Sequence, residues 1–176
     1  MKDSHNLKVL IKKKKIHSKV KELANKIQQD YKDKNPLFLG VLQGAFIFLA
    51  DLVRQIDMNL EINFIEVSSY GANKESSGKV KIEKDIEETI ENRHLIIVED
   101  IVDTGLTMNF LIDYLNKRSP ASIKICSLTS KPTRREMDVN IDYLGFEVPN
   151  KFLVGYGLDF NEQYRNLSAI YTFEDG

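Results

Sequence analysis

The 176-residue sequence is poor in several features that define particular classes of protein. Its single cysteine, Cys126, excludes an intramolecular disulfide and, within an apolar run, is typical of a small buried core residue. No run of about 18 apolar residues is present, so no transmembrane helix is predicted. The polar, charged first residues lack the apolar centre of a signal peptide. We therefore expect a cytoplasmic protein.

A large excess of charge is also missing. The 25 Lys and Arg residues nearly balance the 26 Asp and Glu residues, which leaves a formal net charge of −1. This balance gives no general attraction to nucleic acid or to an anionic membrane, and neither partner is expected. Four lysines at residues 12–15 form a local basic run, which without aromatic neighbours is typical of a solvated helix start. The hydrophobic content of 42% is ordinary, and we expect one domain over residues 1–176.

The most informative stretch is a strand, a loop and a helix at residues 94–118. Residues 94–98 are almost entirely apolar, which predicts a buried strand that ends with Glu99 and Asp100. A loop of small and polar residues follows, and apolar residues at 108, 111, 112 and 115 then predict a helix. This order is typical of an open α/β sheet, in which ligands bind beyond the carboxyl ends of the strands.

The residues of this stretch suit two different groups of one ligand. Backbone N–H groups of a loop that leads into a helix favour a phosphate, assisted here by Thr104, Gly105 and Thr107. The loop has neither the Walker A pattern nor the dinucleotide glycines. Glu99 and Asp100 would repel a phosphate but suit sugar hydroxyls or Mg²⁺. The stretch therefore predicts a site for a ribose phosphate, whereas a receiver-like domain with solvated acids is the less favoured alternative.

Two motifs of this sequence resemble one known family. Residues 98–107 resemble the phosphoribosyl-pyrophosphate (PRPP) motif of type I phosphoribosyltransferases, and residues 145–162 resemble a long signature of the hypoxanthine-guanine branch. The resemblance extends from about residue 7 to residue 172. It implies a type I phosphoribosyltransferase fold: α/β, with a central, mostly parallel twisted sheet flanked by helices. It also implies a small hood built from the N-terminal and C-terminal segments and a flexible hairpin lid at about residues 69–80.

The resemblance further implies a role for individual residues. Asp103 is the implied general base, and Mg²⁺ is the implied cofactor. The remaining implied sites are the phosphate loop (Asp103, Thr104, Gly105, Leu106, Thr107), the ribose and metal acids (Glu99, Asp100), the pyrophosphate site (Gln43, Gly44, Arg165), the purine site (Lys131, Phe152, Leu153, Asp159), a metal ligand (Asp159) and the lid (Ser69, Tyr70).

Some positions depart from the family pattern or lie outside it. Gln43 stands where the branch commonly has Lys, which removes a positive charge from the expected pyrophosphate loop, and Leu106 stands where some relatives carry Lys. A cis peptide bond is often found in that family at the position of residues 42–43. Arg134 and Arg135 are expected to be surface charges. Further elements are predicted at residues 7–11, 15–32, 37–42, 46–53, 61–69, 80–86 and 121–129.

The implied reaction is purine salvage by a Mg²⁺-dependent transferase. Hypoxanthine or guanine and PRPP would give IMP or GMP and pyrophosphate, and the family usually forms dimers or tetramers. Lys131 favours a 6-oxopurine over adenine because an ammonium group only donates hydrogen bonds. A xanthine- or adenine-specific transferase is one alternative, and the choice among 6-oxopurines stays open. A second alternative is an RNA-binding regulator of the same fold, which would need a broad basic face.

Overall fold

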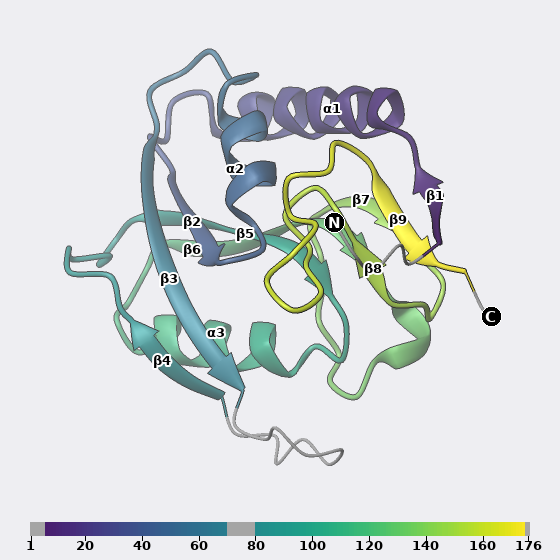
Figure 1. Ribbon diagram of the computed structural model, residues 1–176. Helices are drawn as coiled ribbons and strands as arrows, with labels where there is room; N and C mark the ends of the chain where they lie inside the picture. The colour runs from purple at the N-terminus through teal and green to yellow at the C-terminus, as the bar shows by residue number, and fades with distance from the viewer. Residues whose placement is uncertain (1–5, 70–79, 175–176) are drawn as a thin grey trace.

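The computed structural model describes residues 6–69 and 80–174, which form two β-sheets (Figure 1). The larger sheet has six strands in the order β4-β3-β2-β5-β6-β7, all parallel except β4 at one edge. Its strands are β2 (Leu37–Leu42), β3 (Glu61–Ser69), β4 (Val80–Lys84), β5 (His94–Val102), β6 (Ser122–Ser130) and β7 (Tyr143–Glu147). The smaller sheet, which we call the hood, is antiparallel, with β1 (Leu7–Ile11), β9 (Ile170–Phe173) and β8 (Leu153–Val154) in that order.

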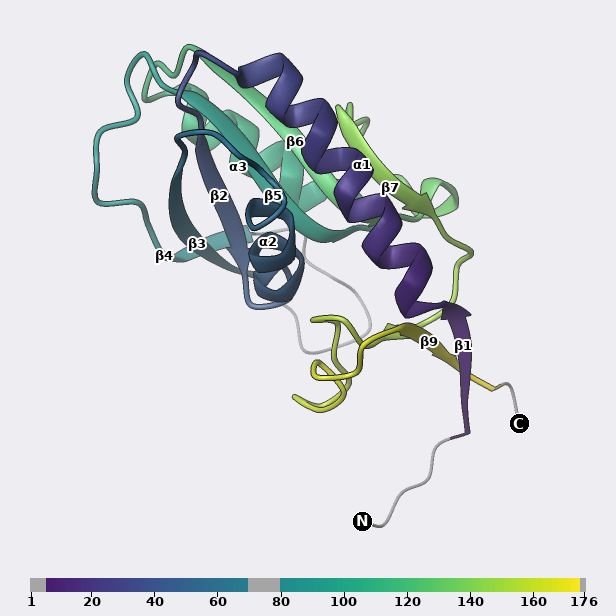
Figure 2. The ribbon, with the colours of Figure 1, turned by 90° about the horizontal axis from the view of Figure 1, so that it is seen from above.

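Helices cover both faces of the larger sheet (Figures 1 and 2). The helices α1 (Lys13–Tyr31) and α2 (Phe46–Val53) lie on one face and α3 (Leu106–Asn116) on the other, and a short 3₁₀ helix, η1 (Pro132–Arg134), follows β6. The central strand β5 accordingly alternates between two cores. Ile96 and Val98 pack with the α1 and α2 side, whereas Leu95 and Ile97 pack with the α3 side. Burial on both faces explains why this strand reads as an unbroken apolar run.

The fold class predicted from the sequence is confirmed, and so are the predicted helices and strands of the larger sheet, with shifts of one to two residues at most ends. The strand predicted over residues 80–86 ends at Lys84. The acids Glu99 and Asp100 lie inside β5, which continues to Val102. The pairing of β9 with β1 and β8 was not predicted strand by strand, because these strands are short and their partners are distant in sequence.

Two minor predictions are also confirmed. Cys126 is fully buried in β6, and burial raises the pKa of its thiol. The lysines at residues 12–15 are exposed at the start of α1. Within residues 6–69 and 80–174, no helix combines the length and the apolar character that spanning a bilayer requires.

Two phenylalanines on α2 offer a direct test of this packing. Phe48 is fully buried, whereas Phe46 is 44% exposed. We expect Phe48→Ala to lower the free energy of unfolding by about 3–5 kcal/mol because it leaves a cavity in the core. Phe46→Ala, the matched control, should change it by about 0.5–1 kcal/mol at most. Urea unfolding measures both, and equal losses for the two variants would contradict the assigned faces of α2.

Candidate active site

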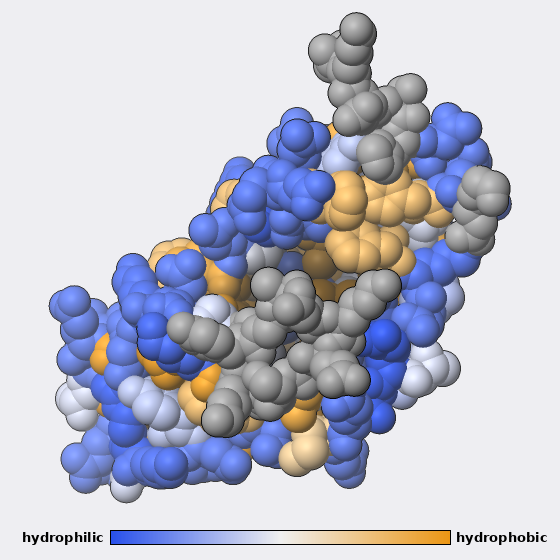
Figure 3. Space-filling model, turned by 60° about the horizontal axis from the view of Figure 1, so that its bottom comes forward, coloured by the Kyte–Doolittle hydropathy of each residue, from blue (hydrophilic) through white to orange (hydrophobic). Residues whose placement is uncertain are grey.

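The loops that follow β2, β5 and β6 meet at the C-terminal ends of these strands, which we call the site edge of the larger sheet. The parallel registers place Gly40 beside Val98, and Val102 beside Ser130, so these strands point the same way and end close together. A space-filling view toward this end of the molecule shows a hollow with apolar surface gathered along one side (Figure 3). Three groups of predicted residues, at 43–44, 103–107 and 131, therefore come from loops that only the sheet brings together.

The two acids of β5 are buried in this edge. Glu99 is 8% exposed and Asp100 is 6% exposed. Burial, together with the neighbouring charge of Asp100, raises the pKa of the Glu99 carboxyl well above its usual range. Burial also raises the pKa of Asp100, although its hydrogen bonds and the charge of Arg165 act in the opposite direction. The pair is thus held in the protein at an electrostatic cost that a cation or hydroxyl donors would offset.

Gly44 lies directly against this acid pair. A Cβ atom at Gly44 would come within 1.8 Å of Asp100 Oδ2, so no residue larger than glycine fits without displacing the carboxylate. The adjoining Leu42–Gln43 peptide bond is cis, as the family resemblance implied. Gln43 itself is exposed. The predicted pyrophosphate loop and the predicted ribose acids are therefore in contact.

The predicted phosphate loop connects β5 to α3. Gly105 has a left-handed φ of +88° and stands as the N-cap of the helix that begins at Leu106. The first N–H groups of a helix have no partner within it, and they point out of its N-terminus. The carbonyl of Thr104 accepts hydrogen bonds from the N–H groups of Glu136 and Met137, at 2.9 and 3.1 Å. This contact holds the loop in a shape that suits an anion.

Two basic residues pair with the carboxylate of Asp103, which the sequence predicts as the general base. Lys131 is 8% exposed, and its Nζ lies 3.8 Å from Asp103 Oδ2. Arg134 Nε donates to Asp103 Oδ1 at 3.0 Å. Lys131 also donates its backbone N–H to the Val102 carbonyl at 3.0 Å, which fixes its distance from β5. The predicted base and the predicted purine ligand are therefore neighbours.

The expectation that Arg134 and Arg135 are surface charges is wrong for Arg135. Arg134 is exposed but pairs with Asp103. The guanidinium of the half-buried Arg135 donates to the carbonyls of Val102, at 2.8 Å, and Asp103, and to Ser130 Oγ at 2.7 Å. Arg135 thereby ties the end of β5 to the end of β6. Two adjacent arginines soon after a predicted strand end were the only sequence signal of this role.

The second signature motif reaches the same edge from the hood. A Cβ atom at Gly157 would lie 2.1 Å from the Gly44 carbonyl oxygen, so the two backbones touch. Arg165 donates to the Gly157 carbonyl at 2.9 Å and forms an ion pair with Asp159 at 3.0 Å. Asp159 also accepts a 3.0 Å hydrogen bond from the Glu162 N–H. Arg165 and Asp159 are therefore paired with each other.

The aromatic residue predicted to contact the purine is available at the surface. Phe152 is 54% exposed, and its ring lies against the rings of Phe160, at 5.6 Å, and Phe173, at 5.9 Å between centroids. The next residue, Leu153, is buried and begins β8. This cluster presents an apolar ring on a rigid support, which is suited to stacking on a flat base.

Two further predictions concern the metal ligands and the lid. Among residues 6–69 and 80–174, no group of three acidic, histidine or cysteine side chains could hold a metal by itself. The acids Glu99, Asp100 and Asp159 are therefore not a preformed three-ligand metal site. Ser69 ends β3, and its backbone pairs with Val80. Tyr70 and the rest of the predicted lid to residue 79 lie outside the described residues.

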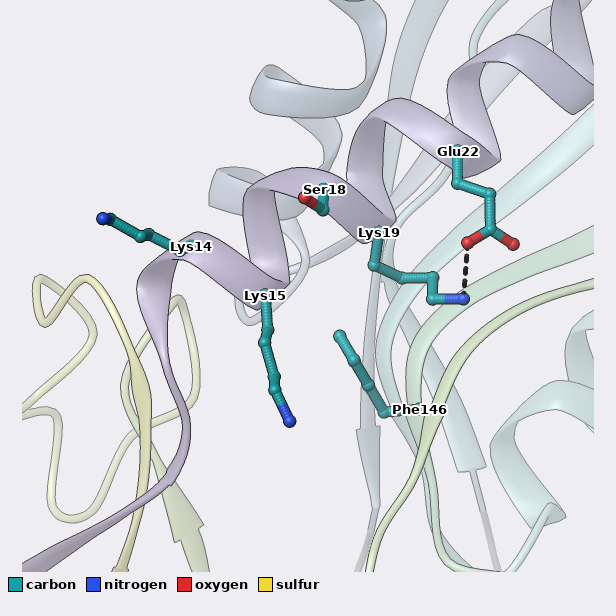
Figure 4. Close-up of a pocket in the computed structure, with 6 residues that line it drawn as sticks. All are labelled: Lys14, Lys15, Ser18, Lys19, Glu22 and Phe146. Carbon is teal, nitrogen blue, oxygen red and sulfur yellow. Dashed lines mark hydrogen bonds and ion pairs between the residues drawn. The ribbon is translucent and has the colours of Figure 1, made fainter.

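A separate surface pocket lies between α1 and β7 (Figure 4). It has a volume of about 390 Å³ and contains an ion pair of 2.7 Å between Lys19 and Glu22. Its lining residues are Lys14, Lys15, Ser18, Lys19, Glu22 and Phe146. None of the predicted site residues lines this pocket, so it carries no part of the site described above.

Known proteins resemble this chain over most of its length. The phosphoribosyl transferase domain family matches residues 9–161. The hypoxanthine-guanine phosphoribosyltransferase of Bacillus subtilis is 50% identical over 163 residues, covering 93% of this chain and 91% of that protein. The protein of the same name from Aquifex aeolicus is 49% identical over 170 residues, covering 96% of each. A crystal structure of a hypoxanthine-guanine phosphoribosyltransferase from Bacillus anthracis has a TM-score of 0.89 at 44% identity, covering 94% of this chain and 97% of that one.

The burial of Glu99 predicts a change in stability. A carboxyl whose pKa is raised on folding binds more protons in the folded state, so stability falls as pH rises above its unfolded pKa of about 4.5. We expect Glu99→Gln to remove this loss and to raise the free energy of unfolding at pH 7 by roughly 1 kcal/mol, or about 2–4 °C in Tm.

Thermal unfolding between pH 4.5 and pH 8 measures this effect. The gain should shrink as pH falls toward 4.5, and Glu91→Gln, at an exposed position, should show no such trend. A Glu99→Gln protein that is less stable than the wild type at pH 7 would contradict the account.

Proposed function

This chain belongs to the hypoxanthine-guanine branch of the phosphoribosyltransferase family, and from that premise we propose how its residues carry out the reaction. It is a purine salvage enzyme, a transferase that moves the 5-phosphoribosyl group of PRPP to N9 of hypoxanthine or guanine. The products are IMP or GMP and pyrophosphate. The reaction needs one site for three parts of PRPP and an adjoining site for a flat base, and residues 43–165 supply both.

PRPP is proposed to lie across the carboxyl ends of β2 and β5. Its 5-phosphate occupies the loop of residues 103–107, at the N-terminus of α3. Its ribose hydroxyls donate to Glu99 and Asp100, whose burial leaves them in need of donors or a cation. Its pyrophosphate lies at Gln43 and Gly44, with Arg165 as the cationic partner, and Gly44 lies against Asp100. With Gln43 in place of a lysine, Arg165 carries more of the charge at this site.

The observation that carries the proposal is the 3.8 Å approach of Lys131 to Asp103. A 6-oxopurine has N7 and O6 on one edge, side by side. A base that takes the proton from N7 and a donor that binds O6 must therefore also be neighbours. Lys131 and Asp103 meet this requirement, and the Phe152 ring gives the base a surface to stack on.

The proposed chemical step exchanges one bond at the anomeric carbon. N9 of the purine forms a bond to C1 of the ribose as the bond from C1 to the pyrophosphate oxygen breaks, and the electron pair leaves with pyrophosphate. The proton on N7 passes to the Asp103 carboxylate. Positive charge develops on the ribose ring during the step, and Glu99 and Asp100 lie at its hydroxyls to stabilise that charge. Arg165 stabilises the negative charge of the leaving group.

Mg²⁺ is the proposed cofactor, and the donor set fits it in part. Glu99 and Asp100 offer buried carboxylate oxygens, the ligand type that Mg²⁺ prefers, and Mg²⁺ commonly takes one or two protein carboxylates together with substrate phosphates. The absence of a cluster of three ligands among the described residues agrees with that sharing. Asp159 would join only by releasing Arg165. Bound there, Mg²⁺ supplies positive charge to the pyrophosphate.

We also propose that the enzyme works in the cytoplasm as one domain that assembles into a dimer or a tetramer, with a lid formed by residues 69–80. The family resemblance supports all of these points. The apolar side chains of Val9 and Ile62, each 45% exposed, support the assembly. Light scattering coupled to gel filtration measures the assembly, and a monomer at micromolar concentration would overturn that part.

The deciding experiment measures pyrophosphate release from PRPP and Mg²⁺ with four bases supplied separately. Turnover is expected with hypoxanthine or guanine and not with adenine. Turnover with adenine alone, or with none of the four bases, would refute the assigned reaction. A gel-shift assay with RNA in moderate salt would then test the regulator alternative.

Replacing the proposed general base tests the proton transfer. Asp103→Asn keeps the shape of the side chain but does not accept the N7 proton, so kcat should fall by about 10²–10⁴-fold. The KM for PRPP should change little, because the loop amides that bind the phosphate remain. Steady-state kinetics measures both constants, with Asp113→Asn on the exposed face of α3 as the control. A kcat within a factor of a few of the wild type would remove Asp103 from this role.

Replacing the proposed purine ligand tests recognition of the base. Lys131→Met keeps an unbranched side chain that reaches to the position of Cε but removes the donor to O6. We expect kcat/KM for hypoxanthine to fall by about 10–150-fold, which corresponds to the loss of a hydrogen bond to a charged group. The value of kcat/KM for adenine should not rise, so the preference for hypoxanthine should shrink by the same factor. The ratio of kcat/KM for hypoxanthine and adenine measures the effect. An unchanged ratio would exclude Lys131 as the specificity residue.

A further inference from the structure

A side-chain hydrogen bond links the segment between β8 and β9 (residues 155–169, the hood segment) to α2 next to the proposed pyrophosphate site. The Tyr156 hydroxyl donates to Asp51 Oδ2 at 2.7 Å, and the two residues are 105 positions apart in sequence. Tyr156 is 6% exposed and belongs to the core on the α1 and α2 side. Burial and the bond to Asp51 both raise the pKa of the Tyr156 hydroxyl, so it stays protonated and remains a donor.

Three successive residues around Tyr156 have left-handed backbone conformations. Gly155, Tyr156 and Gly157 have φ angles of +97°, +53° and +102°. A left-handed conformation is rare for a bulky residue and persists where its surroundings hold it. The N–H of Tyr156 donates to the Leu167 carbonyl at 2.8 Å, and the N–H of Gly157 donates to the Arg165 carbonyl at 3.0 Å. The same turn thus determines where Arg165 lies.

The other end of the bond is equally close to the site. Asp51 stands on α2, which begins two residues after Gly44, and the backbone of Gly44 touches that of Gly157. Beside this bond, a cavity of about 240 Å³ lies between α1, α2 and the hood segment, lined among others by His17, Asp51, Tyr156 and Ser168. Asp51 and Tyr156 both line this cavity, so the bond between them lies at its wall.

We propose that Tyr156 and Asp51 are positioning residues for the pyrophosphate group of PRPP. Their hydrogen bond holds Gly157 on Gly44, and it thereby holds Arg165 and Asp159 over the loop of residues 43–45. Neither side chain touches the substrate. The inference rests on the proposed function, because it takes from it the pyrophosphate site at Gly44 and Arg165.

Tyr156→Phe removes only the hydroxyl and keeps the ring in the core. We expect the KM for PRPP and the inhibition constant of pyrophosphate each to rise by roughly 3–10-fold, the effect of losing one hydrogen bond. The KM for hypoxanthine should stay within about 2-fold, because the proposed purine contacts Lys131 and Phe152 are not partners in this hydrogen bond. A residue needed only for folding would lower the active fraction and leave the ratio of these two KM values unchanged.

The chain provides a matched control in Tyr143. Its hydroxyl donates to Asp30 Oδ2 at 2.7 Å, and it is 7% exposed, so the pair has the same chemistry between β7 and α1. Tyr143→Phe should lower Tm about as much as Tyr156→Phe does while leaving the KM for PRPP unchanged. An equal rise in that KM for both variants would overturn the proposal.

Changes at Asp51 complete the test. Asp51→Asn keeps an oxygen that accepts the Tyr156 hydroxyl and should behave like the wild type, whereas Asp51→Ala should reproduce the effect of Tyr156→Phe. The double variant Tyr156→Phe with Asp51→Ala should be no worse than either single change, because all three lose the same bond. Additive losses, or an Asp51→Asn protein as impaired as Asp51→Ala, would overturn the proposal.

Calorimetric binding of pyrophosphate in MgCl₂ separates this inference from the proposed function. An absence of turnover in the wild-type protein would refute the proposed transferase function. The positioning role of the Tyr156–Asp51 bond would then be judged by binding alone. Weaker pyrophosphate binding in Tyr156→Phe than in Tyr143→Phe would support it, and equal binding in the two variants would refute it.

Discussion

The parallel pairing of β2, β5 and β6 is the constraint on which the site depends. Parallel hydrogen-bonded neighbours end at the same edge of a sheet, so the loops after these strands meet there whatever their sequences. Each of the three loops contributes one part of the site: residues 43–45, residues 103–107 and residues 131–135. The apolar residues of β5 that pack both cores also set the position of the acids that follow them.

The site is built at an electrostatic cost to the folded protein. Glu99 and Asp100 are buried beside each other, and burial raises the pKa of both carboxyls. Gly44 lies so close to Asp100 that no side chain fits between them. A fold selected for stability alone would place neither group there, because buried like charges destabilise a protein unless a partner compensates them. The arrangement agrees with a ligand that brings hydroxyl donors or a cation.

The second signature motif meets the proposed pyrophosphate loop through backbone contact. Gly157 rests on Gly44, and Arg165 donates to the Gly157 carbonyl while it pairs with Asp159. A pyrophosphate group at the proposed site would compete with Asp159 for Arg165, and the released Asp159 would be free for a metal. The ion pair and the bond to Gly157 hold Arg165 and Asp159 together beside Gly44.

The sequence by itself determined the layers of the fold and singled out most residues of the candidate site. Apolar runs such as residues 94–98 predicted buried strands, and the acids, threonines and glycine of residues 99–107 predicted a ribose phosphate site, because these patterns are local. Only the tertiary structure decided the partners across the chain: Arg134 at Asp103, Lys131 within 3.8 Å of Asp103, Tyr156 bonded to Asp51, and β9 paired with β1. Such contacts depend on how distant elements pack, and no local pattern encodes the distance between two side chains that are 28 to 105 residues apart.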